Sequence, residues 1–138
     1  MIFTRRFLNG ALIASAVMGA LAVAAPFAPA WANSAVPFSA EAFKAAQASG
    51  GPILVEIHAD WCPTCKAQSP ILDKLTANTK FKDLKVFRVD FDAMKPVVQQ
   101  FGAKMQSTLV VFKGAVEQGR SVGDTKQASI AALLDKSL

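Results

Sequence analysis

The sequence predicts an α/β domain with a mixed central sheet of about four strands and helices on both faces. Two observations support this class. Apolar segments rich in β-branched residues alternate with segments whose apolar residues recur at helical spacing. Strands connected through helices are typical of a sheet that is covered on both faces. The chain has 138 residues, which suffices for one such domain.

The first 32 residues differ from the rest of the chain. Two arginines at positions 5 and 6 precede residues 7–32, which contain no charged residue and end in Ala-Trp-Ala. A basic start, an apolar middle and a small-x-small end are typical of a cleaved export signal. We therefore expect cleavage after Ala32 and a periplasmic domain of residues 33–138. The alternative is a membrane anchor formed by an uncleaved segment 7–32.

The charge of the mature domain is moderate. The formal net charge falls from +5 to +3 on cleavage, because the signal contains two arginines and no acidic residue. The remaining basic residues are scattered among acidic ones and do not form a run. This distribution is typical of a solvated surface, so we expect no nucleic-acid partner.

The first half of the domain predicts a helix, a strand and a second helix. Ser39 is placed to cap a helix that extends to about Ala48 and ends at Gly-Gly-Pro. Residues 53–59, "ILVEIHA", form a nearly continuous apolar run, which favours a strand covered on both faces. Helical spacing of apolar residues then predicts a helix over residues 62–79, kinked at Pro70.

The second half predicts three strands and two helices. Strands are expected at 85–91, 108–112 and 116–122, with a short helix at 95–101 after the first of them. We expect strands joined through helices to be parallel, and the last two to form an antiparallel hairpin. A final helix, capped by Asp124 or Thr125, should bury one apolar side made of Ile130, Leu133, Leu134 and Leu138.

Both cysteines of the chain lie in "ADWCPTCK", residues 59–66, where the first predicted strand gives way to a helix. Free amide groups at a helix start stabilise a thiolate over a thiol. Cys62 is therefore placed to attack a disulfide, with Pro63 at the first helical position. Cys65 lies one turn further on and deeper, where it can resolve the mixed disulfide by attacking Cys62.

Two other roles of the cysteines compete with a redox couple. A zinc site needs four ligands, and the chain offers two cysteines and one histidine. The set His58, Cys62 and Cys65 could still bind a softer ion such as Cu(I), which makes a metal-binding protein the alternative function. A structural disulfide that closes so short a loop would add only about 2 kcal/mol. A redox couple fits best.

"ADWCPTCK", followed by Pro70 in "KAQSPILDKL", resembles the active site of the thioredoxin family. The resemblance extends from about Phe38 to Leu138 and includes "KVFRVDFD", "TLVVFKG" and Gly123. The lead-in to the cysteines is also similar to that of exported bacterial thiol:disulfide interchange proteins. The resemblance implies a thioredoxin-like fold and a protein-disulfide oxidoreductase that needs no cofactor.

Further roles are implied by the resemblance. Glu56 stands where the family has a buried acid that accepts the proton of the resolving thiol, and Arg88 stands where a cation near that acid is common. Trp61 should shield the cysteines and offer an apolar contact surface. Pro63 and Thr64 between the cysteines supply no cation that would stabilise the thiolate further, which favours a reductant or an intermediate potential.

Ser107 departs from the family pattern, because a cis-proline precedes the Thr-Leu of this strand in the family. We expect a trans Gln106–Ser107 peptide, since a cis bond before a residue other than proline costs about 2.5–4 kcal/mol. The loop of Ser107 and Thr108 should still approach Cys62 and pair with an extended substrate through its backbone. We expect serine at this position to change how the substrate is bound.

The function predicted from the sequence is that of an exported thiol–disulfide oxidoreductase. Its partners are expected to be protein thiols and disulfides. An exported reductant needs electrons from outside its compartment, so a membrane thiol-relay reductase is implied as their source. We expect the protein to act as a monomer.

Overall fold

The computed structural model describes residues 34–138, so the predicted signal segment lies outside the described residues. Short loops separate the elements of this part of the chain. In chain order the elements are β1 Val36–Pro37, α1 Ala40–Ala48, β2 Pro52–His58, α2 Pro63–Thr76, a 3₁₀ turn Thr79–Phe81, β3 Lys85–Asp90, α3 Lys95–Gln100, β4 Thr108–Lys113, β5 Val116–Val122 and α4 Gln127–Asp135.

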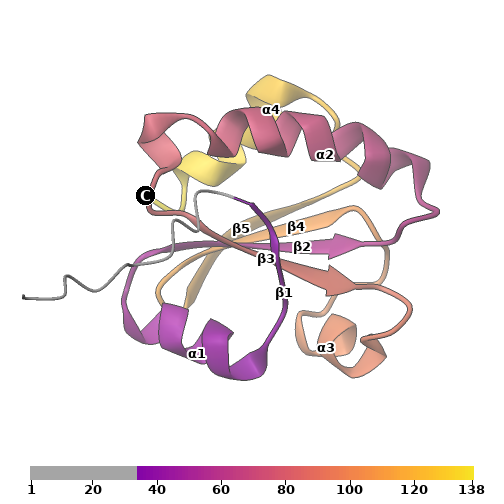
Figure 1. The fold of residues 1–138 in the computed structure, drawn as a ribbon, viewed down its shortest axis with the longest axis horizontal. Helices are drawn as coiled ribbons and strands as arrows, with labels where there is room; N and C mark the ends of the chain where they lie inside the picture. The colour runs from indigo at the N-terminus through magenta and orange to yellow at the C-terminus, as the bar shows by residue number, and fades with distance from the viewer. Residues whose placement is uncertain (1–33) are drawn as a thin grey trace, which may run out of the picture.

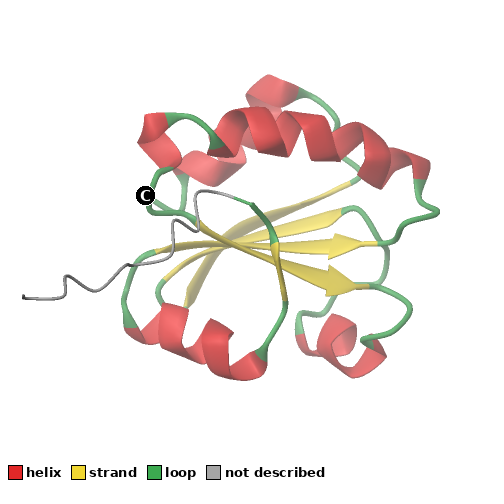
Figure 2. Cartoon of the chain, in the orientation of Figure 1, coloured by secondary structure: helices red, strands yellow, loops and turns green. Residues whose placement is uncertain are grey.

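A five-stranded sheet in the order β1-β3-β2-β4-β5 forms the centre of the molecule. Helices α2 and α4 cover one face of this sheet, and α1 and α3 cover the other (Figure 1). Strands β1, β3 and β2 are parallel, whereas β4 and β5 complete the sheet in antiparallel pairings. The predicted class, a mixed sheet with helices on both faces, is confirmed (Figure 2).

The fifth strand, β1, is an addition to the predicted four. Val36 and Pro37 pair in parallel with Phe87 and Arg88 of β3. The next residue continues the contact, since the amide of Phe38 donates to the carbonyl of Arg88 at 2.8 Å. A strand of two residues is too short to show the alternation by which a strand is found in a sequence.

The direction of β4 corrects the expectation that all helix-linked strands are parallel. β4 runs antiparallel to β2, with Glu56 opposite Leu109 and Ile57 opposite Thr108. A parallel return would require the connection to travel back along the whole of β3, about 20 Å for six residues. The six-residue helix α3 advances only about 9 Å. The chain re-enters the sheet at the end where β3 left it, since Thr108, the first residue of β4, lies opposite Ile57 near the end of β2.

Apolar side chains fill both spaces between the sheet and its helices. Alternating residues of β2 serve the two faces: Ile53, Val55 and Ile57 point toward α1 and α3, and Leu54 points toward α2 and α4. The first layer is rich in phenylalanine rings in mutual edge contact, namely Phe38, Phe43, Phe87, Phe101 and Phe112. The second contains Leu72, Leu75, Leu109, Val111, Ile130, Leu133 and Leu134.

Several helix ends differ from the predicted ones. Helix α2 stops at Thr76, and a separate 3₁₀ turn follows it, capped by the side chain of Asn78. The N-cap of α4 is Lys126, one residue past the predicted candidates, although the carboxylate of Asp124 accepts from the Lys126 amide at 2.9 Å. Leu138, predicted to be buried, is 43% exposed.

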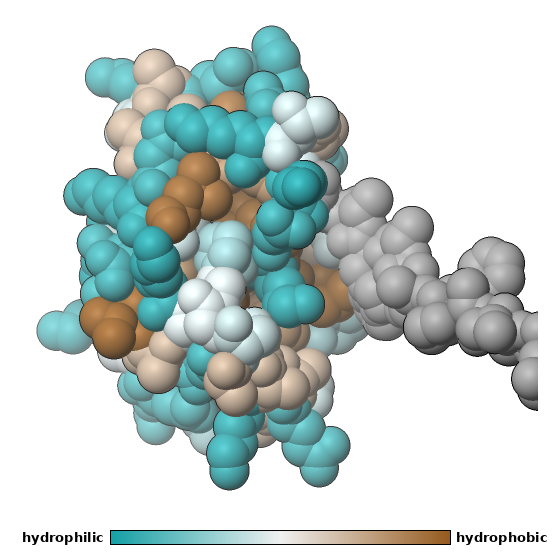
Figure 3. Space-filling view, turned by 90° about the vertical axis from the view of Figure 1, so that its left-hand side faces the viewer, coloured by the Kyte–Doolittle hydropathy of each residue, from teal (hydrophilic) through white to brown (hydrophobic). Residues whose placement is uncertain are grey.

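The outer surface is mostly polar. Figure 3 shows the end of the molecule at which β2 and β3 begin, where hydrophilic side chains surround separate apolar ones. Within residues 34–138 no helix has the length and hydropathy needed to cross a membrane.

Candidate active site

The two cysteines lie where β2 ends and α2 begins, at the carboxyl edge of the parallel strands. Cys62 is the N-cap of α2, Pro63 is the first residue of the helix, and Cys65 follows within the first turn. The cysteines form a disulfide, and their Cα atoms are 5.3 Å apart. Loops at this edge of an open α/β sheet are the usual place for a site.

The sulfur of Cys62 lies at the amide end of α2, as the sequence predicted. The amide of Cys65 donates to Cys62 Sγ at 3.0 Å. The first amides of a helix have no partner within the helix, and they carry the positive end of its dipole. This arrangement stabilises negative charge on Cys62 once the disulfide is reduced. The expected difference in depth is absent, because both cysteines are 1% exposed.

Ser107 faces the disulfide from the loop before β4. Its Oγ lies 3.9 Å from Cys62 Sγ. No cis peptide occurs within the described residues, so the predicted trans Gln106–Ser107 bond is confirmed. Ser107 has a φ of +54° and is the one described residue other than glycine with a positive φ. The loop thus reaches Cys62 through a left-handed serine, where the family has a cis-proline.

Two hydrogen bonds hold the backbone of Ser107 in this conformation. Its carbonyl accepts from the amide of Gly123 at 2.9 Å and from the Gln68 side chain at 3.3 Å. Gln68 also donates to the carbonyl of Asp124 at 2.8 Å. Helix α2, the loop before β4 and the turn after β5 are therefore tied together behind the disulfide.

Glu56 is buried on the face of the sheet that α2 covers, and it is 1% exposed. Its Oε2 accepts from Arg88 Nε at 3.0 Å, which confirms the pairing suggested for Arg88. The two residues are neighbours because β2 and β3 pair in parallel with Glu56 opposite Arg88. The guanidinium provides the charge that a buried carboxylate requires.

His58 is next to Glu56 on the same face, two residues further along β2. Its Nδ1 is 3.3 Å from Glu56 Oε1, and its Nε2 is 3.4 Å from Oδ1 of Asp60. The set His58, Cys62 and Cys65 is not brought together as three ligands: residues 34–138 contain no group of three or more His, Cys, Asp or Glu side chains that could hold a metal ion.

Apolar side chains are exposed beside the disulfide. Trp61 is 58% exposed, and its indole Nε1 donates to Asp92 Oδ2 at 2.6 Å. Met105, in the loop that leads to Ser107, is 55% exposed. The carbonyl of Met105 accepts from the hydroxyl of Thr108 at 2.7 Å. The sequence-predicted Thr64 is half-buried between the cysteines.

A turn after β3 holds the partner of Trp61 in place. The carboxylate of Asp90 accepts from the amides of Ala93 and Asp92, each at 2.8 Å. These two bonds hold the pKa of Asp90 below its ordinary value. The turn thereby fixes the position of Asp92 relative to the indole of Trp61.

Several contributors to the site, among them Met105, Gln68 and Asp92, were missed in the sequence. Gln68 is fully buried, and a signal for it exists: it is the one polar residue in a buried stripe of α2 that runs from Cys65 through Leu72 to Leu75. A polar residue in such a stripe must find partners inside the protein. Asp92 carried no local signal, since its partner Trp61 is 31 residues away.

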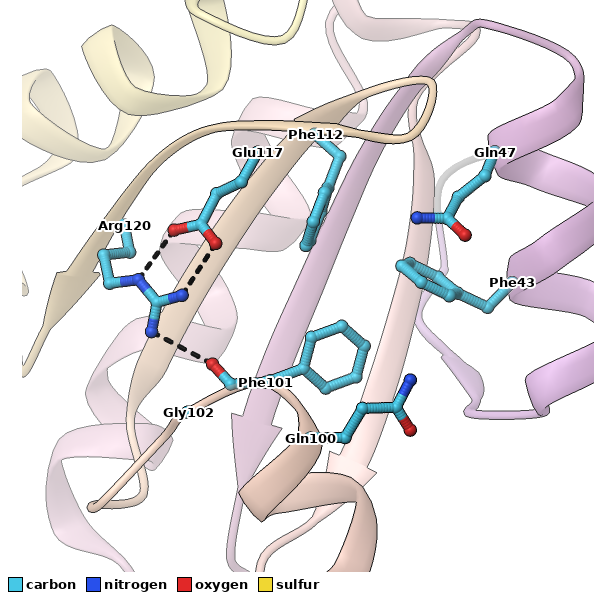
Figure 4. A pocket seen from close by; sticks show the side chains of 8 residues that line it. All are labelled: Phe43, Gln47, Gln100, Phe101, Gly102, Phe112, Glu117 and Arg120. Carbon is cyan, nitrogen blue, oxygen red and sulfur yellow. Dashed lines mark hydrogen bonds and ion pairs between the residues drawn. The ribbon is translucent and has the colours of Figure 1, made fainter.

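A pocket of about 370 Å³ lies between α1 and α3, on the face of the sheet that these two helices cover (Figure 4). Phe43, Phe101 and Phe112 form its apolar wall. Its charged residues are already engaged with each other, since Arg120 Nε donates to Glu117 Oε1 at 2.7 Å. Neither cysteine is among the residues that line this pocket.

Comparisons with known proteins agree with this geometry. Residues 34–136 match the family model described as Thioredoxin. A thioredoxin of Chlamydia muridarum is 34% identical over 64% of this chain and 84% of its own length. "Thioredoxin Asp f 29" of Aspergillus fumigatus is 33% identical over 63% of this chain and 79% of its own. The crystal structure of Trxlp from Edwardsiella tarda EIB202 has a TM-score of 0.71 and 44% identity, covering 73% of this chain and 98% of that one.

Proposed function

The chain belongs to the thioredoxin family, whose members are thiol–disulfide oxidoreductases, and from this premise we propose that it reduces or exchanges protein disulfides outside the cytoplasm through Cys62 and Cys65. The observation that carries the proposal is the position of Cys62. Its sulfur accepts a hydrogen bond from the Cys65 amide at the start of α2. A thiolate at this position is stabilised and nucleophilic.

The reaction consists of two exchanges. The Cys62 thiolate attacks a substrate disulfide, one substrate sulfur leaves as a thiolate, and a mixed disulfide forms. Cys65 then attacks Cys62 Sγ, which releases the second substrate sulfur and regenerates the disulfide seen here. Glu56 takes the proton from the Cys65 thiol, because it is a buried carboxylate on the face of the sheet that α2 covers.

Substrate binds at the exposed apolar residues around the disulfide. Trp61 and Met105 offer a contact surface, and the backbone of Ser107 and Thr108 pairs with an extended substrate segment. Both cysteines are 1% exposed in the disulfide form, so Cys62 must become accessible when the disulfide is reduced or when a partner docks. The protein acts as a monomer, since one chain supplies both cysteines.

The pattern of residues 1–32, which is that of a cleaved signal, supports export. Outside the cytoplasm the oxidised disulfide of a reductant must be reduced again after each cycle, so a membrane thiol-relay reductase supplies the electrons. Expression in a secreting bacterium, followed by mass spectrometry of the periplasmic fraction, tests the location. The proposal requires a mature protein that begins at Asn33. A full-length chain retained in the membrane would establish the uncleaved anchor instead.

Trapping tests the chemistry. In Cys65→Ser the resolving thiol is absent, so mixed disulfides between Cys62 and client proteins accumulate and can be identified after non-reducing electrophoresis. Cys62→Ser is the matched control, because it removes the attacking thiol from the same site. Adducts in the Cys62→Ser variant, or none in Cys65→Ser, would refute a dithiol mechanism that starts at Cys62.

A further inference from the structure

Glu56, as the proton acceptor of the reaction, must return its proton to solvent in every cycle, yet its carboxyl group is 1% exposed. Its Oε2 is occupied by Arg88 at 3.0 Å. Arginine has no acceptor and keeps its own protons, so no proton can leave on that side. A proton on Glu56 must therefore leave from Oε1.

Oε1 of Glu56 faces His58. The distance from Oε1 to Nδ1 of the imidazole is 3.3 Å. Neither atom makes a hydrogen bond within the described part of the chain, although both are buried. Buried polar atoms without a partner are rare and call for an explanation. A small rotation of either side chain would join these two atoms in a hydrogen bond of ordinary length.

The other ring nitrogen of His58 leads to water. Nε2 is 3.4 Å from Oδ1 of Asp60, and the side chain of Asp60 is fully exposed. Imidazole can accept a proton at one nitrogen while it releases one at the other. The three groups thus form a continuous path from a buried carboxyl group to the surface.

We propose that His58 carries the proton between Glu56 and solvent in each redox cycle. When Cys65 attacks Cys62, the Cys65 proton passes to Glu56, then to His58 Nδ1, and the Nε2 proton leaves toward Asp60 and water. No electron moves on this path, and reduction of the disulfide by a partner returns a proton along it. His58 acts through Glu56 and does not touch the sulfurs.

Three carboxylates and one guanidinium lie around His58. Glu56 lies on its own strand, and Asp60 follows in the next loop. Asp90 is opposite His58 in the parallel register with β3, and its carboxylate interacts electrostatically with the ring. Arg88, beyond Glu56, is the opposing cation.

The inference rests on the proposed function, and a single-turnover experiment separates the two. Reduced protein is mixed with a peptide disulfide, quenched with acid, and analysed by mass spectrometry for the mixed disulfide and for the oxidised protein. His58→Ala removes the ring, His58→Phe fills its space without a titratable group, and His58→Gln keeps a polar side chain. Each is measured with and without added imidazole.

The proposal requires formation of the mixed disulfide at the wild-type rate in all three variants. Its decay should slow by at least about tenfold, since a positioned proton-transfer group typically contributes about 10²–10⁴-fold. Imidazole should restore the decay in His58→Ala, which leaves a space for it, and not in His58→Phe. If His58→Ala does not fold, the slow decay of His58→Phe and His58→Gln still tests the relay.

Two results would overturn the relay. Decay at the wild-type rate in His58→Phe would show that the ring only fills space, and equal acceleration by imidazole in every variant would show catalysis by bulk base. A wild-type protein that forms no mixed disulfide would refute the thiol-exchange function itself.

Discussion

Ser107 is a buried residue held in a conformation that L-residues avoid. Its φ of +54° places its Cβ against the following carbonyl, a contact that costs about 1–2 kcal/mol. The hydrogen bonds from Gly123 and Gln68 to its carbonyl keep it there. Strain of this kind, next to reactive sulfurs, is typical of a functional position.

A matched pair of variants measures this strain. Ser107→Gly and Ser107→Ala both lack the hydroxyl group, and only alanine keeps the Cβ that crowds the carbonyl. We expect the free energy of unfolding of the glycine variant to exceed that of the alanine variant by about 1 kcal/mol. Urea unfolding of the disulfide forms gives this difference. Equal stability, or a more stable alanine variant, would show that Ser107 is unstrained.

Residue roles could be predicted where the motif itself contained them. The position of Glu56, six residues before Cys62 in an apolar strand, predicted a buried acid, and its pairing with Arg88 followed the resemblance. The left-handed backbone of Ser107 could not be predicted, because contacts from Gly123 and Gln68 impose it. These contacts join segments far apart in the sequence.

Among the elements, α4 begins with a carboxylate outside the helix. Asp124 accepts from the amide of Lys126 and from the hydroxyl of Ser129. These bonds stabilise the ionised form, so the pKa of Asp124 lies below its ordinary value of 3.8. Such a group stabilises the fold above its unfolded pKa, and this contribution is lost as pH falls through its folded pKa.

Asp124→Ala should therefore lower the free energy of unfolding by an amount that depends on pH. At pH 7 we expect its free energy of unfolding to fall by about 0.5–1 kcal/mol, the size of a lost exposed cap. The gap to wild type should close as the pH falls below 3.8, the ordinary value for this carboxyl group. Denaturant unfolding over a pH series measures it. A gap that does not narrow at all as the pH falls below 3.8 would contradict the role of the carboxylate.

The β4–β5 hairpin turns at Gly114, which has a φ of +57° and packs against the end of α1. A Cβ there would be 3.2 Å from Gly50 Cα and 3.3 Å from the Gln47 carbonyl oxygen. Gly102 also has a positive φ, +61°, but a Cβ there would meet only an arginine tip at 3.9 Å. An alanine at either position would adopt the same unfavourable positive φ, but only at Gly114 would its Cβ also collide with neighbouring backbone atoms.

Comparison of the two alanine variants isolates that collision. Gly102→Ala should lose about 1 kcal/mol of unfolding free energy from its backbone alone. Gly114→Ala should lose at least about 1 kcal/mol more, because the neighbour is backbone and must shift. Thermal or urea unfolding gives both values. Equal losses at the two positions would mean that the hairpin does not pack against α1 as described.

Element type was more predictable than element direction. Periodicity located β2, β3, β4, β5 and the four helices to within a few residues, because each buries an apolar face. The antiparallel direction of β4 could not be predicted from periodicity, because a buried strand shows the same pattern in either direction. The strand β1 could not be predicted either, because two residues contain no pattern.

In the molecule as a whole, the fold positions the site residues at one edge of the sheet. Two apolar layers fix β2 and α2, and their junction positions Cys62 at the amide end of the helix. The loop before β4 enters the sheet at this same edge because β4 is antiparallel to β2. The sheet order therefore brings Ser107 to the disulfide, although 45 residues separate it from Cys62.

Activation of Cys62 by the helix amides can be measured from the rate at which each thiol of the reduced protein is alkylated, followed by mass spectrometry over a pH series. We expect Cys62 to become reactive well below pH 8.5, the ordinary pKa of a free cysteine, and to react faster than Cys65 throughout. If Cys62 reacts like an ordinary exposed thiol, or no faster than Cys65, the helix amides do not activate it, and a dithiol mechanism that starts at Cys62 is contradicted.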